Sequence, residues 1–288
     1  GGSGGYGRAG GVYLDNGTIV NCYIINNKLM GYSTTGNTSY CVCYGGGVYM
    51  YSGTMYNTVI AKNEVKAKWA EGAGVFMEEG YFFNNTCIGN KATCNNSYGR
   101  GSGGISIWCN ADGGKSLYVF NTISIDNETS TGQTLGDKNI SVTTNGVINC
   151  FNCISTLNPS QIYSSGNNKI LFNNCVQFDE SKRNELFSSA TGTTFADYDL
   201  RPIGSSLAVN TGINEPEMNG TIIADLSAFT DMDYADRIQD CTVDIGAYEY
   251  NGAYSITPDT GTSGEAVYYV TQNGAGNASA ANPENAAC

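Results

Sequence analysis

The sequence predicts an all-β protein built as a right-handed parallel β-helix, a solenoid whose stacked coils are closed by a C-terminal cap. Three observations predict it. An Asn-containing motif recurs along the chain, a Gly-containing motif precedes its early copies, and the interval between copies varies. Self-similarity at a period of about 20–50 residues is typical of solenoids, because a single repeat cannot bury its apolar face and stacked repeats can.

The Asn motif consists of an Asn, any residue and two mostly apolar residues, with a second Asn five or six residues after the first. The copies begin at Asn21, Asn57, Asn85 and Asn121, with second members Asn27, Asn63, Asn90 and Asn127, and degenerate copies begin at Asn152 and Asn174. Asn tolerates a left-handed backbone corner and can hydrogen-bond to the equivalent Asn one coil away. We therefore expect an Asn ladder along the coils.

The Gly motif places short runs of β-branched and aromatic residues after a corner. Its copies begin at Gly10, Gly46, Ala73 and Gly103. Such runs, separated by Gly or Asn, favour short strands joined by tight corners. We expect the second residue after each motif Asn to point inward, which gives one interior column: Tyr23, Val59, Cys87, Ile123, Ile154 and Val176.

The spacing of the copies predicts inserted loops. Successive copies are 36, 28, 36, 31 and 22 residues apart, and the shortest interval suits a three-sided coil. The longer intervals predict polar loops on one side of the stack, at Leu29–Tyr40, Lys62–Glu71, Lys91–Arg100 and Glu128–Lys138. A β-propeller would keep a fixed period of about 40–45 residues. An α-solenoid would need a period of about 3.6 residues, which is missing.

The coils are expected over residues 1–194 and the cap over 195–250. The cap contains a Leu-, Ser- and Ala-rich stretch from Leu200 to Gly212 and the sequence Asp-Ile-Gly-Ala-Tyr-Glu from Asp244 to Glu249. With the Gly-motif coils, these stretches resemble the pectin-lyase-like β-helix proteins of Bacteroidota-type bacteria, the choice-of-anchor Q family. The resemblance implies an exported protein, secreted or held at the cell surface, with adhesion or carbohydrate contact as its function. We expect Asp244 and Glu249 to hydrogen-bond to backbone in the cap.

The tail differs from the rest of the chain. A linker rich in Gly, Ser and Thr covers 251–266, and a cap-like strand of a following module or a neighbouring subunit is expected in 267–288. The tail resembles the first strand of the same family, which there precedes the coils. A tandem β-helix, a circular permutation and a cap for another copy all remain open, and the Gly-rich opening favours a fragment or a processed form. The expected assembly residues, which would join copies head to tail, are Val267, Tyr268, Tyr269, Val270, Thr271 and Gln272.

Composition excludes several function classes. Lys and Arg number 14 against 26 Asp and Glu, for a net charge of −12, which disfavours nucleic acid as a partner. The chain has no His, so Ser-His-Asp triads and His-ligated metals are excluded. No apolar run is long enough to span a bilayer, so no membrane insertion by this segment is expected. The 11 Cys are expected to be mostly reduced and buried as small apolar residues.

Two candidate binding sites stand out in the sequence. No cofactor is expected unless it is Ca²⁺, which oxygen ligands at short spacing suit, and the candidate ligands are Asp231, Asp233, Asp236 and Asp240. Aromatic rings in or beside the loops would form a groove for a polysaccharide if they lie in an exposed row, or pack between coils if they do not. These are Tyr32, Tyr40, Tyr44, Trp69, Tyr98 and Trp108.

Three function classes follow, in order of preference. The first is a non-catalytic surface module for adhesion or glycan binding, and the second is a structural module of a tandem array or fibre. The third is a carbohydrate-active enzyme, either a polysaccharide lyase or a glycoside hydrolase. The sequence leans away from catalysis, because the paired Asp, Gly-His-Gly and Arg-Ile-Lys motifs of polygalacturonase-type enzymes are missing and the coil acids are isolated. No catalytic residue is therefore assigned.

Overall fold

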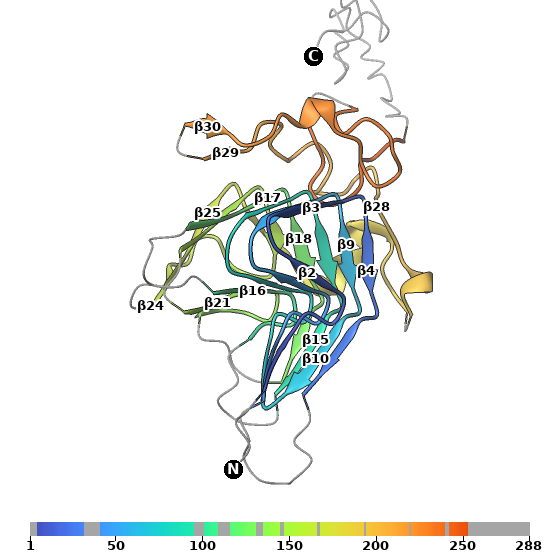
Figure 1. Cartoon of the computed structure of the whole chain (residues 1–288). Coiled ribbons are helices and arrows are strands. Elements are labelled where there is room, and N and C mark those ends of the chain that lie inside the picture. The colour runs from blue at the N-terminus through green and yellow to red at the C-terminus, as the bar shows by residue number, and fades with distance from the viewer. Residues whose placement is uncertain are drawn as a thin grey trace, which may run out of the picture.

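The computed structural model describes residues 5–31, 41–94, 101–108, 116–130, 135–144, 147–165, 168–192, 194–218, 220–239 and 242–252. It is nearly all-β, with short parallel strands stacked into sheets, an arrangement consistent with a parallel β-helix. In each coil the chain passes through up to five sheets, named A to E here in the order in which the chain visits them. Figure 1 shows the strands winding around a common centre.

Sheets B, C and D enclose the main core, and nearly all of their strands pair in parallel. Sheet B contains β2 (Val12–Leu14), β7 (Val48–Met50), β12 (Val75–Met77), β16 (Ile105–Trp108) and β21 (Ile140–Thr144), with β20 (Leu135–Gly136) antiparallel at its edge. Sheet C contains β3 (Gly17–Val20), β8 (Gly53–Tyr56), β13 (Tyr81–Phe83), β17 (Ser116–Phe120), β22 (Val147–Phe151) and β25 (Asn168–Asn173), with β24 (Tyr163–Ser165) antiparallel at its edge. Sheet D contains β4 (Tyr23–Ile25), β9 (Val59–Ala61), β14 (Thr86–Ile88), β18 (Ile123–Ile125), β23 (Ile154–Ser155) and β26 (Val176–Gln177).

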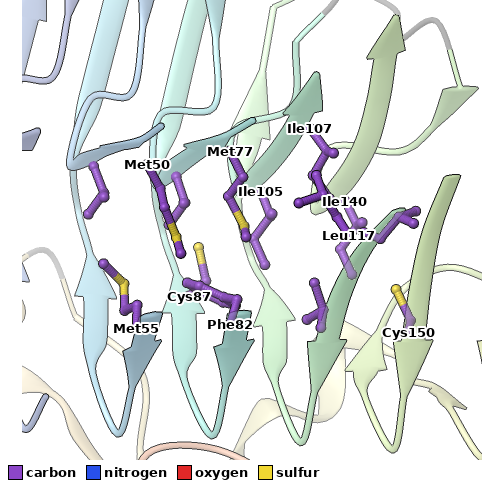
Figure 2. Close-up of a cluster of buried hydrophobic side chains, with 14 of the residues drawn as sticks. Met50, Met55, Met77, Phe82, Cys87, Ile105, Ile107, Leu117, Ile140 and Cys150 are labelled. Atoms are coloured by element: carbon purple, nitrogen blue, oxygen red, sulfur yellow. The ribbon is translucent and has the colours of Figure 1, made fainter. Parts of the chain in front are cut away.

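The main core is filled by one inward-facing set of side chains per coil. Met50, Met55 and Met77 point from different strands toward the same interior (Figure 2). Aliphatic residues, Phe82 and Cys87 complete this buried cluster. The stacking confirms that successive coils bury a continuous apolar interior, as the repeat pattern predicts.

Sheets A and E form a narrower extension of the coils. Sheet A contains β1 (Tyr6–Arg8), β6 (Val42–Tyr44) and β11 (Trp69–Glu71), and sheet E contains β5 (Lys28–Met30), β10 (Glu64–Ala67), β15 (Lys91–Cys94) and β19 (Glu128–Thr129). Small side chains such as Ala67, Ala70 and Cys43 fill the space between the two sheets. The expectation of inserted loops is thus wrong for Lys62–Glu71, which holds the two stacked strands β10 and β11. The other three predicted loops each begin within a strand of sheet E, namely β5, β15 and β19.

The C-terminal segment, 178–252, leaves the stack after β26, ahead of the boundary expected at residue 194. It contains η1 (Glu180–Glu185), β27 (Phe187–Ser189), η2 (Phe195–Asp197), β28 (Asp199–Pro202), β29 (Glu217–Met218), β30 (Thr221–Ile222) and η3 (Leu226–Ala228). It lies outside the coils, yellow to orange in Figure 1. Gly246 donates to the Asn121 carbonyl, Ala247 donates to Thr86 Oγ1, and the hydroxyls of Tyr248 and Tyr23 hydrogen-bond. The segment therefore covers the side of the coils, so the Asp244–Glu249 stretch of the expected cap does not close their C-terminal end.

This side cover explains an error in the predicted interior column. Val59, Ile123 and Ile154 are aligned in sheet D as expected, but they pack with the C-terminal segment, whereas the neighbouring Ile60 faces the main core. Both faces of sheet D are apolar because both are covered, so alternation gives no signal there. Tyr23 and Val176 lie in the same outer column, and Cys87 is the one predicted member that points inward.

The register of one coil is shifted by one residue from the prediction. Thr86, not Cys87, aligns with Val59 and Ile123. Asn84, not Asn85, occupies the left-handed corner, with φ of 53°. The consecutive Asn residues at 84 and 85 make the two registers indistinguishable in sequence.

The two Asn columns have separate roles. The first members, Asn21, Asn57, Asn84, Asn121, Asn152 and Asn174, all have positive φ between 46° and 53°. The second members form the hydrogen-bonded ladder, in which Asn63 Nδ2 donates to Asn90 Oδ1 at 2.9 Å and Asn90 Nδ2 donates to Asn127 Oδ1 at 3.0 Å. The expected Asn ladder is confirmed at this second column.

Candidate functional site

A charged cavity of about 940 Å³ lies where the corner between sheets D and E meets the C-terminal segment. The coil side of the cavity is a column of residues just before the ladder Asn, and all are left-handed: Asn26, Lys62, Gly89 and Asp126, with φ of 54–66°. Lys62, Gly89 and Asp126 line the cavity. The ladder behind them fixes their backbone, since each ladder Oδ1 also accepts from the amide of the preceding ladder Asn.

The opposite wall is η1, which ion pairs attach to the coils. Arg183 NH1 lies 3.2 Å from Asp126 Oδ2. Glu180 Oε1 accepts from the Asp126 amide at 2.6 Å and from Asn139 Nδ2 at 2.8 Å, while Glu180 Oε2 pairs with Lys138. Every oxygen of Glu180 is therefore engaged.

Burial and charge set the electrostatics of this wall. The Asp126 side chain is only 12% exposed. Burial raises the pKa of Asp126, Glu180 raises it further, and Arg183 opposes both effects. On the neighbouring sheet E, the hydrogen bond from Lys91 at 2.7 Å lowers the pKa of Glu128.

Lys62 and Tyr198 form the middle of the site. The Lys62 side chain lies across Gly89, where a Cβ would be 3.2–3.4 Å from its last three atoms. Lys62 Nζ is 4.7 Å from the centre of the Tyr198 ring, a cation–π contact. Among the described residues no carboxylate oxygen is within 4.0 Å of Lys62 Nζ.

Tyr198 also lines a second, aromatic pocket of about 230 Å³. Tyr23, Phe195 and Tyr248 line this pocket, and the Tyr23 and Phe195 ring centres are 5.8 Å apart. Arg201 stacks over Tyr248 at 5.2 Å. The two pockets, joined at Tyr198, are called the corner groove below. Its coil residues run from Tyr23 in the first coil to Gln177 in the sixth, which is roughly 24 Å at the usual strand spacing.

The aromatic residues expected from sequence do not form an exposed row where the structure describes them. Tyr44 is buried, with its ring 4.4 Å from Phe76 and 5.8 Å from Trp108 between centroids. Trp69 and Trp108 are partly buried in the same cluster. These residues thus follow the alternative of rings packed against the coils. Tyr32, Tyr40 and Tyr98 lie outside the described residues.

The acidic residues expected to bind Ca²⁺ have other partners. Asp231 accepts from the amides of Asp233, Ala235 and Glu249 at 2.8–3.0 Å, and the Asp233 carboxylate is bound by Arg201 Nε and NH2. Asp236 is exposed, and Asp240 lies outside the described residues. Within the described ranges, no group of three or more acidic or Cys side chains is arranged to hold a metal ion. Calcium binding stays a prediction.

The expected assembly residues, Val267, Tyr268, Tyr269, Val270, Thr271 and Gln272, lie outside the described residues. Head-to-tail contact through them stays a prediction. Deleting residues 254–288 and measuring the molecular mass by light scattering would test it, because an unchanged mass and stability would contradict an assembly role.

Comparisons with family models, curated proteins and solved structures gave no significant match. In the described part of the chain, no helix has the length and apolarity to cross a membrane.

Sequence reasoning missed most of the corner groove. One signal was available: the residue before each second Asn is Asn26, Lys62, Gly89 or Asp126, a single column with changing chemistry. The partners Glu180, Arg183 and Tyr198 come from a segment without repeats, so no periodicity could place them opposite that column.

Proposed function

We propose that this chain is a right-handed parallel β-helix that binds a glycan in the corner groove and acts as an exported surface module without catalysis. The right-handed sense is supported by a general rule, since crossovers between parallel strands of one sheet are right-handed in about 98% of cases. Export to the cell surface or medium rests on the resemblance of the Asp244–Glu249 and Gly-motif stretches.

The observation that carries glycan binding is the shape and chemistry of the corner groove. It is elongated along the stack, lined mostly by polar groups, and has Tyr198 at the junction of its two pockets. Sugars present hydroxyls at their edges and C–H groups on their faces, so a site for them combines hydrogen-bonding side chains with an aromatic ring. Gln177, Thr156 and Lys62 supply the first, and Tyr198 the second.

Binding is favoured over hydrolysis because the two acids between the coils and η1, Asp126 and Glu180, are already engaged. A hydrolase needs one carboxyl group that donates a proton and one that activates water or attacks the sugar. Both Glu180 oxygens accept hydrogen bonds or pair with Lys138, and Asp126 pairs with Arg183. If either carboxyl group acted as proton donor or nucleophile, it would lose the contacts that hold η1 against the coils.

A glycan array probed with the full chain, with and without Ca²⁺, tests the proposal. The affinity for each glycan that binds is then measured for Tyr198→Ala, for Lys62→Met and for the control Tyr6→Ala. The exposed side chain of Tyr6 lies on sheet A, away from the groove. Loss of the ring should weaken binding about tenfold, and Tyr6→Ala should bind like the parent. Equal binding by Tyr198→Ala and the parent would reject the groove, and release of reducing ends from a bound glycan would reject the non-catalytic assignment.

A further inference from the structure

A pocket of about 420 Å³, separate from the two pockets of the corner groove, lies at the corner between sheets B and C. It belongs to other coil positions than the corner groove and shares no lining residue with it. We propose that this pocket, called the tyrosine pocket, binds a neutral sugar unit of an oligosaccharide. The inference is independent of binding in the corner groove.

Glycines create the hollow. Gly17 and Gly53 are paired neighbours, and Gly80 follows in the next coil. Gly53 and Gly80 have φ of 110° and 115°, and a Cβ on either would lie 2.2–2.4 Å from the carbonyl oxygen of the preceding coil's glycine. Only glycine fits at Gly53 and Gly80, so these two corner positions carry no side chain and the flanking residues become walls.

Three tyrosines line the hollow: Tyr51, Tyr81 and Tyr118. Tyr81 and Tyr118 are paired neighbours in sheet C and pack on the cluster beneath the C-terminal segment, which fixes their rings. Tyr51 is 43% exposed at the corner itself. Among the described residues, no hydrogen bond engages these three hydroxyls, so each can bond to a ligand.

A preformed polar edge completes the pocket. Ser52 Oγ donates to Asp15 Oδ1 at 2.9 Å and accepts from the Asn16 amide at 2.8 Å. This network holds the strand corner in place beside Tyr51. Rings held by packing, next to a fixed polar edge, bind a sugar with little loss of side-chain freedom.

The charge of the pocket selects the ligand class. Among the described residues no Lys or Arg lines it, and the charged side chain in its lining is that of Glu79. The chain as a whole carries a net charge of −12. A carboxylated or sulfated sugar would be repelled, so the ligand is a neutral sugar.

The test uses neutral hexasaccharides of glucose, mannose and xylose, with a uronic acid oligomer as the charged comparison. Binding to the full chain is measured by saturation-transfer NMR and calorimetry for the parent, Tyr51→Ala, Thr54→Tyr, Tyr198→Ala and the control Tyr6→Ala. Tyr51→Ala removes an exposed ring, and Thr54→Tyr fills the pocket from a residue that lines it. Both should weaken neutral-sugar binding tenfold or more, while the control Tyr6→Ala, exposed on sheet A and outside this pocket, should leave it unchanged.

Several results would overturn the proposal. They are no binding of any neutral hexasaccharide, unchanged binding by Tyr51→Ala, or loss of neutral-sugar binding in Tyr198→Ala alone. The last outcome would place the sugar in the corner groove. Circular dichroism melts of each variant separate loss of binding from loss of fold, and Tyr51→Ala should melt close to the temperature of the parent because Tyr51 is 43% exposed and lies outside the buried clusters.

Discussion

Arg237 Nε lies 3.0 Å from Glu249 Oε1, and both side chains are almost completely buried between the coils and the C-terminal segment. Glu249 also accepts from the Asp244 amide through both oxygens, at 3.0 and 3.1 Å. With its amide turned to place the oxygen toward the guanidinium, Asn84 accepts from Arg237 Nε at 3.0 Å. The ion pair therefore lies within the C-terminal segment, and the hydrogen bond to Asn84 joins it to the coil corner. The expected backbone hydrogen bonds of Asp244 and Glu249 are confirmed, since Asp244 accepts from the amides of Asn210 and Tyr250 and Glu249 from that of Asp244.

Removing one member of this pair should destabilise the protein strongly. Burial raises the pKa of Glu249 and lowers that of Arg237, so each group tolerates its charge mainly because of its partners. We expect Arg237→Met or Glu249→Gln to lower the free energy of unfolding by about 3–5 kcal/mol, and the double variant to lose less than the sum of the two. Urea unfolding measures this. Lys91→Ala, which breaks an exposed pair, should change it by less than about 1 kcal/mol, and additive losses at Arg237 and Glu249 would contradict the coupling.

The Asn ladder should matter more for stability than the left-handed position just before it. Asn90 accepts from the amide and Nδ2 of Asn63 and donates to Asn127 Oδ1 and to the Ile60 carbonyl. Asn90→Leu would leave these buried groups unpaired, at a cost of about 3 kcal/mol or more. Asn26→Gly, at an exposed left-handed position, should be close to neutral. Thermal melts of both variants check this, and similar melting temperatures would contradict the assigned roles.

Structural features encoded by repeated sequence motifs could be predicted, and features that depend on segments without repeats could not. The Asn and Gly motifs predicted stacked parallel strands and the ladder, because each repeat restates the same local chemistry. The facing of Val59 could not be predicted, since the segment that covers it shares no pattern with the coils. The register at Asn84 could not be predicted either, because two adjacent Asn residues fit the corner equally well.

The same limit applies to the sites. The sequence shows Asp126 and Lys62 only as isolated charged residues. The structure places them with Gly89 in one column of left-handed positions. Tyr51 and Tyr81 lie next to Gly53 and Gly80 in sequence, but these residues line one pocket only because the coils stack. Conversely, the packing of Tyr44 and Trp108 against Phe76 could not be predicted from spacing, because these three rings come from different sheets or coils.

Neighbouring residues of β9 should respond differently to a charge. Val59 faces the C-terminal segment and Ile60 faces the main core, and both are fully buried. Ile60→Asp should prevent stacking of the coils, because an unpaired charge in the interior has no route to water. Val59→Asp should release the C-terminal segment while the coils persist. Limited proteolysis, with the fragments identified by mass, distinguishes the two, and identical digestion patterns would contradict the two-sided burial of sheet D.

The buried thiols should resist alkylation in the folded protein. All cysteines among the described residues are free, and Cys43 and Cys87 are buried. Burial raises the pKa of each of these two thiols to about 12, so the reactive thiolate is scarce at pH 8. We expect iodoacetamide to modify the half-buried Cys22 first and Cys87 only after unfolding in urea, as followed by peptide mass spectrometry. Modification of Cys87 at the rate of Cys22 in native buffer would contradict this burial.

Two acids at the same corner should give pH dependences of opposite sign. Burial raises the pKa of Asp126, so the folded state keeps this proton to a higher pH than the unfolded chain does. The stability that this group contributes is present below its unfolded pKa and is lost as pH rises through the folded pKa. The Lys91 hydrogen bond lowers the pKa of Glu128, so the contribution of Glu128 is present above its unfolded pKa and is lost as pH falls through the folded pKa. Between pH 3 and pH 7, the unfolding free energy of Asp126→Asn should therefore increase relative to that of the parent as pH rises. That of Glu128→Gln should decrease relative to the parent over the same range. If both variants change in the same direction, η1 does not desolvate Asp126 and the corner groove is more open than described.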